Sequence, residues 1–379
     1  MHIGVVAGET SGDALAAGLI GALQQQRPDV RISGIGGPKM SSLGAENLYP
    51  MERISIMGLD GLMENLPAIL KIRRHVKQHF NHQQIDAFVG VDVPDFNLGL
   101  ELALRRQGIP TIHYVSPTVW AWRGYRIHKI RRAVDHMLTL FPFEASFYKQ
   151  HDVPVTCVGH PMADAIPNSD QTSEARSALE LNTNQKIIAL LPGSRVREIE
   201  KMGLLFVEAA ARLHQQQPGI HFLVPMASME TRQAFEKLCG EHCKDLSFDV
   251  LDGDAHQAIA ASDAILVASG TAALETLLFG KPMVVAYRVS TMSYWFVRCF
   301  SQVKHYSMPN HLLPSPMVPE FIQNDATPDA LANSLLDYLN NPHKVSELQH
   351  EFSKVHEQLH GGGSELAAKA VLSTMTASD

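Results

Sequence analysis

The chain has 379 residues, 45% of them hydrophobic and 19% charged, which is the composition of a folded globular protein. At about 100 to 200 residues per domain, this length predicts two domains. The formal net charge of −7 excludes a protein that wraps duplex DNA, so no nucleic-acid partner is expected. Four scattered cysteines exclude a disulfide framework and fit a reducing compartment.

The first residues lack a basic segment and a long apolar segment, so we expect no secretory signal and a cytoplasmic protein. No run of about 18 apolar residues is present to span a bilayer. Cys239 and Cys243, with His242 between them, have the spacing of half a zinc site. No second ligand pair accompanies them, which favours a surface or core-edge position over a metal site.

Short apolar runs alternate with amphipathic stretches, the pattern of βαβ units in parallel sheets. We expect one series of strands at 2–7, 32–36, 87–91, 111–115, 136–140 and 155–158. A second series is expected at 187–191, 221–225, 247–251, 264–268 and 283–286. A polar segment at 166–173 separates them, which predicts domains over 1–166 and 167–340 and a helical tail over 341–379. Two such α/β domains, doubly wound and in tandem, place a ligand cleft between them, beyond the carboxyl ends of the strands.

The loop after the first strand contains Glu9, Thr10, Ser11 and Gly12 and leads directly into a helical run. Glycine permits close backbone approach, the hydroxyls are donors, and a helix start carries partial positive charge, so the loop suits a phosphate. It lacks the G-x-G-x-x-G dinucleotide fingerprint. A tight turn with an N-cap explains the loop equally well.

The second domain has two loops of this kind. Arg195 follows a glycine turn at a helix entrance, where a permanently charged guanidinium can clamp a diphosphate; the alternative is a surface salt bridge to Glu198. The other loop contains Ser269, Gly270 and Thr271, whose small size lets a ligand approach the next helix. Glu275, one turn beyond Thr271, can accept both hydroxyls of a ribose, or it is an ordinary capping or salt-bridging glutamate.

Asp92 ends an apolar strand, where a buried carboxylate is costly unless it has a partner or a function. Facing a cleft, it can take a proton from a hydroxyl nucleophile. Asp95 is better explained as a helix cap. His113 and Trp120, in a segment rich in aromatic and basic residues, either line a sugar or acyl pocket or pack in the core. His160, beside the expected hinge, either reaches the ligand or bonds the backbone there.

Residues 58–80 form an apolar stripe followed by a basic cluster. Pro67 is expected to start a second short helix within this segment. Core packing explains any apolar stripe, but an apolar stripe with a cationic flank also suits a membrane interface with anionic lipid. The candidate membrane or acyl contacts are Leu62, Met63, Leu66, Ile69 and Leu70.

Together these segments resemble the lipid-A-disaccharide synthases, a family of bacterial glycosyltransferases. The motifs that carry the resemblance are V-A-G-E-T-S-G-D (6–13), V-D-V-P-D-F-N (91–97), I-H-Y-V-S-P-T-V-W-A-W-R (112–123), G-H-P-M-A-D (159–164), L-L-P-G-S-R (190–195), A-S-D-A-I-L-V-A-S-G-T-A-A-L-E (261–275) and Y-S-M-P-N (306–310). They span essentially the whole chain. The tryptophan segment is specific, whereas S-G-T-A-A-L-E alone indicates a nucleotide-sugar fold.

The resemblance implies a GT-B fold, two Rossmann-like domains with the donor held mainly by the second and a C-terminal helix returning to the first. It implies transfer of a sugar from UDP-2,3-diacylglucosamine to the 6-hydroxyl of 2,3-diacylglucosamine 1-phosphate (lipid X), with inversion. Asp92 would be the base, Arg195, Ser269, Gly270 and Thr271 would neutralise the diphosphate, Glu275 would bind ribose, and Asn310 would lie near the phosphates. No metal-binding D-x-D is evident in a suitable loop, which fits a mechanism without metal or cofactor.

Because both substrates are acylated, the resemblance also favours contact between the apolar stripe and the inner face of the bacterial inner membrane. A homodimer is compatible with the family. Two other functions are kept open. One is a UDP-sugar isomerase of the same fold, which needs no acceptor; the other is a membrane-surface binder without catalysis, for which Asp92 is dispensable. The missing fingerprint disfavours a nicotinamide oxidoreductase.

Overall fold

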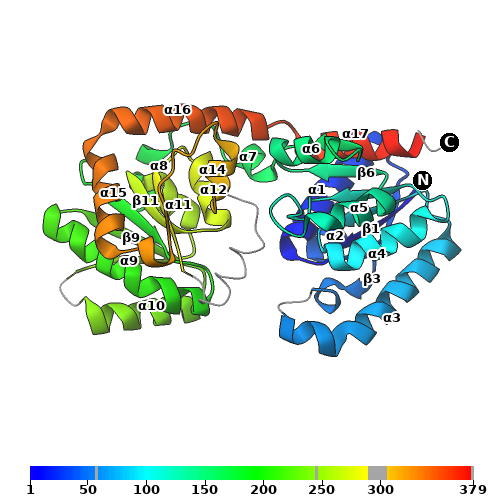
Figure 1. Cartoon of the computed structure of the whole chain (residues 1–379), viewed down its shortest axis with the longest axis horizontal. Helices are drawn as coiled ribbons and strands as arrows, with labels where there is room; N and C mark the ends of the chain where they lie inside the picture. The colour runs from blue at the N-terminus through cyan, green and yellow to red at the C-terminus, as the bar shows by residue number, and fades with distance from the viewer. Residues whose placement is uncertain (56–58, 244–245, 289–304, 377–379) are drawn as a thin grey trace. The chain divides into compact units, whose positions relative to one another are not determined.

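The computed structural model (Figure 1) describes residues 1–55, 59–243, 246–288 and 305–376, and only the backbone of 59–65. The chain forms two compact units. The first contains Met1–Asp164 and Gln358–Asp379, and the second contains Ala165–Glu357. The helical tail expected over 341–379 is thus divided between the two units, because most of its first helix, α16 (Pro342–Leu359), belongs to the second unit.

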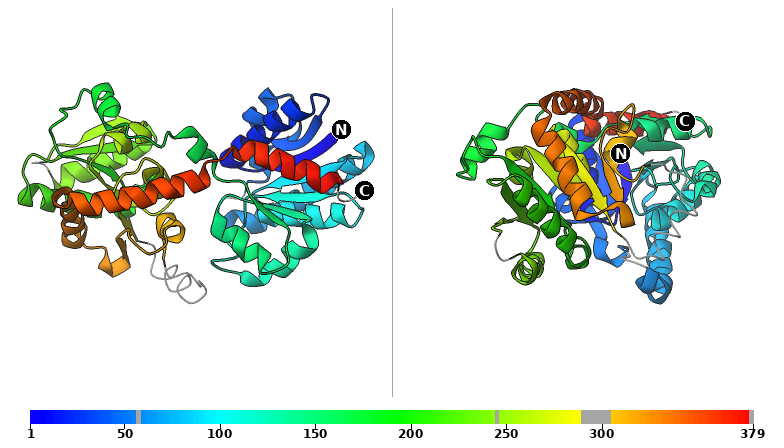
Figure 2. Two further views of the ribbon diagram at one scale, coloured as in Figure 1. Left: turned by 90° about the horizontal axis from the view of Figure 1, so that it is seen from above. Right: turned by 60° about the vertical axis from the view of Figure 1, so that its left-hand side comes forward.

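The first unit is a parallel sheet of order β3-β2-β1-β4-β5-β6-β7. Its strands are β1 (His2–Ala7), β2 (Arg31–Gly36), β3 (Glu46–Pro50), β4 (Ala87–Val91), β5 (Thr111–Tyr114), β6 (His136–Thr139) and β7 (Val155–Cys157). Its helices are α1 (Thr10–Gln26), α2 (Pro38–Ser42), α3 (Leu59–Gln83), α4 (Pro94–Arg105), α5 (Ile127–Ala133), α6 (Pro142–Lys149), α7 (Pro161–Ala165), which crosses the division, and α17 (Gly363–Thr376). Helix α17, red in Figure 2, packs on α1 although more than 300 residues separate them.

The second unit is a parallel sheet of order β10-β9-β8-β11-β12-β13. Its strands are β8 (Ile187–Leu191), β9 (His221–Met226), β10 (Asp249–Asp252), β11 (Ala264–Ala268), β12 (Met283–Tyr287) and β13 (Glu320–Ile322). Its helices are α8 (Thr172–Ala178), α9 (Val196–Gln216), α10 (Met229–His242), α11 (Ala255–Ala261), α12 (Thr271–Leu278), α14 (Met308–Leu312), α15 (Pro328–Asn340) and α16 (Pro342–Leu359). The prediction of two doubly wound parallel sheets is confirmed.

Burial explains which strands the sequence revealed. Strands β1, β4 and β8 are buried along their whole length, because helices cover both faces of a parallel sheet, and such strands are continuous apolar runs. Strands β3 and β13 were not expected. Strand β3 lies at an edge with half-buried or exposed residues, and β13 has three half-buried residues, so neither produces an apolar run.

Helix α3 corrects the expectation that Pro67 separates two short helices. It is continuous from Leu59 to Gln83, with Pro67 inside it. A proline removes one helical hydrogen bond. The residues that follow it, including Ile72, Val76 and Phe80, are buried in the core of the first unit, and this packing stabilises the helix beyond the proline.

Candidate functional site

The candidate residues of the first unit follow β1 and β4, which are neighbours in the sheet although β2 and β3 lie between them in sequence. This is the point at which the strand order reverses, where doubly wound sheets bind ligands. Ala7 pairs with Val91, so the loop after β1 and Asp92 lie at the same edge. A Cβ at Gly8 would lie 2.5 Å from Val93 Cγ2, so glycine is needed for this close approach.

Within the loop, Glu9, Thr10 and Ser11 are exposed, whereas Gly12 is buried at the start of α1. Asp13, the last residue of this motif, has a structural role. Its carboxylate is 1% exposed and accepts hydrogen bonds from the backbone N–H groups of Gly37 (2.8 Å), Lys39 (2.9 Å) and Met40 (3.1 Å). It therefore caps α2.

Asp92 is half-buried directly beyond β4 in a left-handed backbone conformation, with φ of 52°, and Val93 follows with φ of 42°. Non-glycine residues adopt this region at a cost, and such strain concentrates at functional sites. The side-chain amide of Asn97 holds the turn by donating to the Asp92 carbonyl at 2.7 Å. Asp95 is not the helix cap we expected: its carboxylate is exposed and pairs with Arg126 Nη2 at 2.6 Å.

His113 is completely buried on β5, so its ring does not line a surface. Its Nδ1 lies 2.7 Å from Oε1 of Glu101 on α4, which is also completely buried. Burial opposes the imidazolium, but the Glu101 charge and hydrogen bond outweigh it and raise the pKa of His113. Burial raises the pKa of Glu101 as well, so the pair retains a proton between its two members.

Trp120 and His160 belong to an aromatic group at the carboxyl ends of β5, β6 and β7. The Trp120 ring contacts Phe143 edge-on at 4.8 Å, and Phe141 stacks on Phe143 at 5.7 Å and on His160 at 5.5 Å. The His160 backbone N–H donates to Leu359 O at 2.9 Å, within the first unit. Beneath the rings, burial raises the pKa of Glu144 to about 7, although Phe141 N and Trp120 donate to its carboxylate.

In the second unit the loops after β8 and β11 meet at the corresponding reversal point, where Leu191 pairs with Val267. Arg195 begins α9 with a side chain that is 74% exposed and lies 3.6 Å from Glu198. The Glu198 carboxylate accepts from the Ser194 N–H at 2.8 Å, and Gly193 (φ 136°) leaves the space that Glu198 fills. The salt bridge to Glu198, which the sequence offered as the alternative to a diphosphate clamp, is present.

Ser269, Gly270 and Thr271 form the entrance of α12, and Gly270 and Thr271 are exposed. Ser269 Oγ donates to the Tyr306 carbonyl at 3.2 Å, which connects this entrance to the segment before α14. That segment is organised by Glu320, whose carboxylate accepts from Tyr306 N, Ser307 N and Ser307 Oγ at 2.6 to 3.1 Å.

Asn310 is 6% exposed, and its amide is already fully used. Its Nδ2 donates to Val318 O at 2.8 Å and Glu320 Oε1 at 2.7 Å, and its Oδ1 accepts from Met317 N and Val318 N at 3.1 Å. Two donors and two acceptor positions are the whole capacity of an amide. The structure therefore places Asn310 as a support of the neighbouring loop.

Glu275 lies on α12 with 18% of its side chain exposed, and its Oε1 is 3.7 Å from Nε2 of His256 on α11. The hydrogen bond to Glu275 raises the pKa of His256 despite burial. The carboxylate thus has the salt-bridging role considered above.

The apolar stripe on α3 contains both buried and exposed residues. Ile69 is 6% exposed and belongs to the core of the first unit, whereas Leu66 and Leu70 are 46% and 42% exposed. The side chains of Leu62 and Met63 lie outside the described part. No helix within the described ranges is long and apolar enough to cross a membrane.

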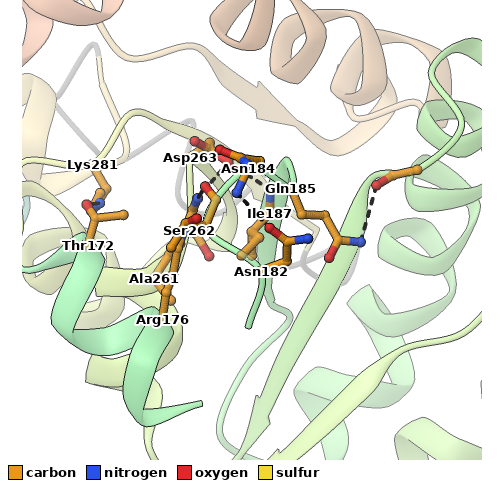
Figure 3. Close-up of polar contacts among 12 residues, drawn as sticks. Thr172, Arg176, Asn182, Asn184, Gln185, Ile187, Ala261, Ser262, Asp263 and Lys281 are labelled. Atoms are coloured by element: carbon orange, nitrogen blue, oxygen red, sulfur yellow. Dashed lines mark hydrogen bonds and ion pairs between the residues drawn. The ribbon is translucent and has the colours of Figure 1, made fainter. Parts of the chain in front are cut away.

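The buried charges of the second unit lie at the opposite edge of its sheet, where the strands begin (Figure 3). Arg176 pairs with Asp263 at 2.9 Å and donates to the Ala261 and Thr183 carbonyls, while Lys281 Nζ donates to Thr172 Oγ1 at 2.6 Å. These contacts attach α8 to the sheet. Among the residues that the model describes, no group of three or more His, Cys, Asp or Glu residues can hold a metal ion.

Comparison with known proteins identifies the family. The family model described as lipid-A-disaccharide synthetase matches residues 3–374. The chain belongs to this family. It is 45% identical to the lipid-A-disaccharide synthase of Methylobacillus flagellatus, over 98% of both chains, and 47% identical to that of Azotobacter vinelandii, over 98% of this chain and 97% of the other.

A solved UDP-GlcNAc 2-epimerase from Neisseria meningitidis, bound to UDP-GlcNAc, has a TM-score of 0.64 at 14% identity and covers both chains fully. At this identity the likeness shows the GT-B fold alone, so it does not favour the isomerase alternative. Lipid-A-disaccharide synthases are glycosyltransferases, and the enzyme class expected from the motifs is confirmed.

Sequence reasoning did not single out Glu101, Glu144 or Glu320. Glu101 gave a usable signal, because it lies three residues after Leu98 and three before Leu104, on the buried face of α4. Glu144 and Glu320 gave none, since their importance comes from partners on other elements.

Proposed function

We propose that this protein joins UDP-2,3-diacylglucosamine to lipid X, forming a β-1,6 disaccharide and releasing UDP. The observation that supports the proposal most strongly is the position of the candidate residues. In each unit they lie where the strand order reverses, with Asp92 in the first unit and Arg195 with 269–271 in the second. Family membership supplies the substrate class.

In the proposed reaction, the acceptor 6-hydroxyl gives its proton to Asp92 as its oxygen forms a bond to the anomeric carbon of the donor. The bond from that carbon to UDP breaks, and its electron pair leaves with UDP. A single displacement inverts the anomeric carbon. Arg195, Thr271 and the start of α12 would stabilise the charge on the leaving diphosphate. Glu275 would accept hydrogen bonds from ribose, and Asn310 would support the donor loop rather than bind phosphate directly.

UDP release tests the proposed reaction. The purified protein is incubated with the acylated donor, with and without lipid X, and with wild-type or Asp92→Asn enzyme. We expect release that requires both lipid X and Asp92. Turnover without acceptor would favour the isomerase, and full activity in D92N would remove Asp92 as the base.

We also propose that the enzyme works at the inner face of the inner membrane, with Leu66 and Leu70 of α3 contacting lipid and the exposed Lys71 and Arg74 contacting anionic headgroups. The test is sedimentation with anionic vesicles. Leu66→Ser with Leu70→Ser should weaken binding about 10- to 100-fold, since burying a fully exposed leucine contributes roughly 1.5 to 3 kcal/mol and somewhat less than half of each side chain is exposed. The matched control is Met229→Ser with Leu366→Ser, two exposed apolar residues elsewhere. Equal binding by both double variants would contradict the proposal.

A further inference from the structure

The buried pair of Glu101 and His113 has no evident value for stability. Both side chains are 0% exposed. A buried ionic or proton-sharing pair loses the hydration of both groups, and apolar residues of similar volume usually stabilise a core at least as well. Parallel sheets covered by helices normally place aliphatic side chains here. The pair therefore requires an explanation beyond packing.

Polar atoms around the pair are left unsatisfied. Within the described part of the chain, His113 Nε2, Glu101 Oε2 and Asn97 Oδ1 are buried without hydrogen-bond partners. Each such atom costs about 1 to 3 kcal/mol. They occur together next to one strand end, the end that carries Asp92.

The surrounding backbone is shaped to admit the pair. Gly90, two residues before Asp92, pairs in register with His113. A Cβ at Gly90 would lie 2.3 Å from Glu101 Oε1 and 2.9 Å from Asn97 Cβ, so a side chain at this position would displace the pair.

Asp92 connects to this group in two ways. Asn97 donates to the Asp92 carbonyl and so fixes the left-handed turn. The Asp92 charge is also close enough to His113 to contribute to raising the pKa of the imidazole. Glu101 occupies Nδ1, which leaves Nε2 as the remaining polar edge of the ring.

We propose that Glu101 and His113 are positioning residues for the transfer reaction: Glu101 fixes the His113 ring, and the fixed ring orients the Asp92 carboxylate toward the acceptor hydroxyl. This inference rests on the proposed role of Asp92 as base. The pair retains its own proton throughout; the proton that moves passes from the acceptor hydroxyl to Asp92.

The test compares Glu101→Leu with Glu101→Gln. Glutamine keeps an oxygen that accepts from His113 Nδ1, whereas leucine removes it. We expect E101L to lower kcat about 10- to 100-fold, the cost of a small misplacement of a reacting group, with the KM of both substrates changed less than twofold. We expect E101Q to retain at least about a third of the wild-type kcat, because the ring stays anchored.

Two further variants make the outcome decisive. If E101L folds poorly, Glu101→Leu with His113→Leu replaces it, because this double variant leaves no buried polar partner behind. In a D92N background, loss of the pair should lower the residual kcat less than twofold, since the pair acts through Asp92. Three results would each overturn the inference. The folded leucine variant could keep the wild-type kcat, or it could change only KM. Alternatively, loss of the pair could lower kcat as much in the D92N background as in the wild type. Failure of the proposed function is seen separately, as absence of wild-type turnover.

Discussion

The two units have the same type of sheet, but each buries a group of ionisable side chains at one edge, and the two edges are opposite. In the first unit, Glu101, His113 and Glu144 are buried beyond or beside the carboxyl ends of the strands, the edge that carries Asp92. In the second unit, Arg176 and Lys281 are buried at the amino ends (Figure 3), while Arg195 and Thr271 are exposed at the carboxyl ends. We propose that the carboxyl-end edge of the first unit holds a base in a fixed orientation and that the carboxyl-end edge of the second unit receives a charged ligand.

The pH dependence of stability should reveal the buried carboxyl group of Glu144 in the first unit. The folded pKa of Glu144 is raised from its ordinary 4.5 to about 7 by burial. The folded state therefore binds the proton more tightly, so this contribution is complete below about pH 4.5 and is lost as the pH rises through 7. The difference is at most about 3 kcal/mol.

Amide hydrogen exchange of α6 measures this effect. Protection should fall between pH 5 and 7.5, after correction for intrinsic exchange, and Glu144→Gln should abolish the fall. The control is Glu52→Gln, an exposed glutamate of the same unit. An unchanged pH dependence in E144Q would show that Glu144 is not the group responsible.

Lys281, buried at the amino ends of the strands of the second unit, should make stability depend on pH in a different range. Burial lowers the pKa of Lys281 to about 8, although Asp170 and Asp263 oppose this shift. The unfolded chain then binds the proton more tightly than the folded chain. The contribution of Lys281 to the free energy of unfolding is therefore most favourable above about pH 10.5 and is lost as the pH falls through 8. The size is again at most about 3 kcal/mol.

Lys281→Met should therefore stabilise the second unit near pH 7 and flatten its dependence between pH 8 and 10. Hydrogen exchange of α8 is the measurement, since Lys281 donates to Thr172 at the start of this helix. Lys237→Met is the matched control on the exposed part of α10. Lower protection of α8 in K281M at pH 7 would mean that the hydrogen bond outweighs the cost of burial.

Because Arg195 is exposed at the carboxyl ends of the strands of the second unit, we predict that removing its side chain lowers the affinity for UDP. Arg195→Ala should weaken UDP binding about 10- to 100-fold, because a charge-assisted hydrogen bond contributes roughly 1.5 to 3 kcal/mol. Calorimetric titration with UDP measures it. Arg212→Ala, an exposed arginine of α9 that pairs with Asp329, is the control and should bind as the wild type. Equal affinity in R195A and R212A would place the diphosphate elsewhere.

The sequence was sufficient for features that depend on local pattern. Buried parallel strands are apolar runs, and the loops that follow them contain Asp92 and Arg195, so the parallel sheets and these loops could be predicted, whereas the strand order could not. It was insufficient where a partner comes from another element. Asn310 has the side chain of a phosphate ligand, but contacts with residues 317–320 occupy its amide. Ile69 shares a stripe with Leu66, but the core of the first unit buries it.

The division of work between the units is tested most directly by measuring UDP affinity and turnover in the same two variants. D92N should bind UDP within twofold of the wild type and lower kcat about 10²- to 10⁴-fold, the usual contribution of a general base. R195A should lose UDP affinity. If D92N instead weakens UDP binding while turnover at saturating donor stays at the wild-type rate, Asp92 is a donor ligand and the assignment of roles to the two units is wrong.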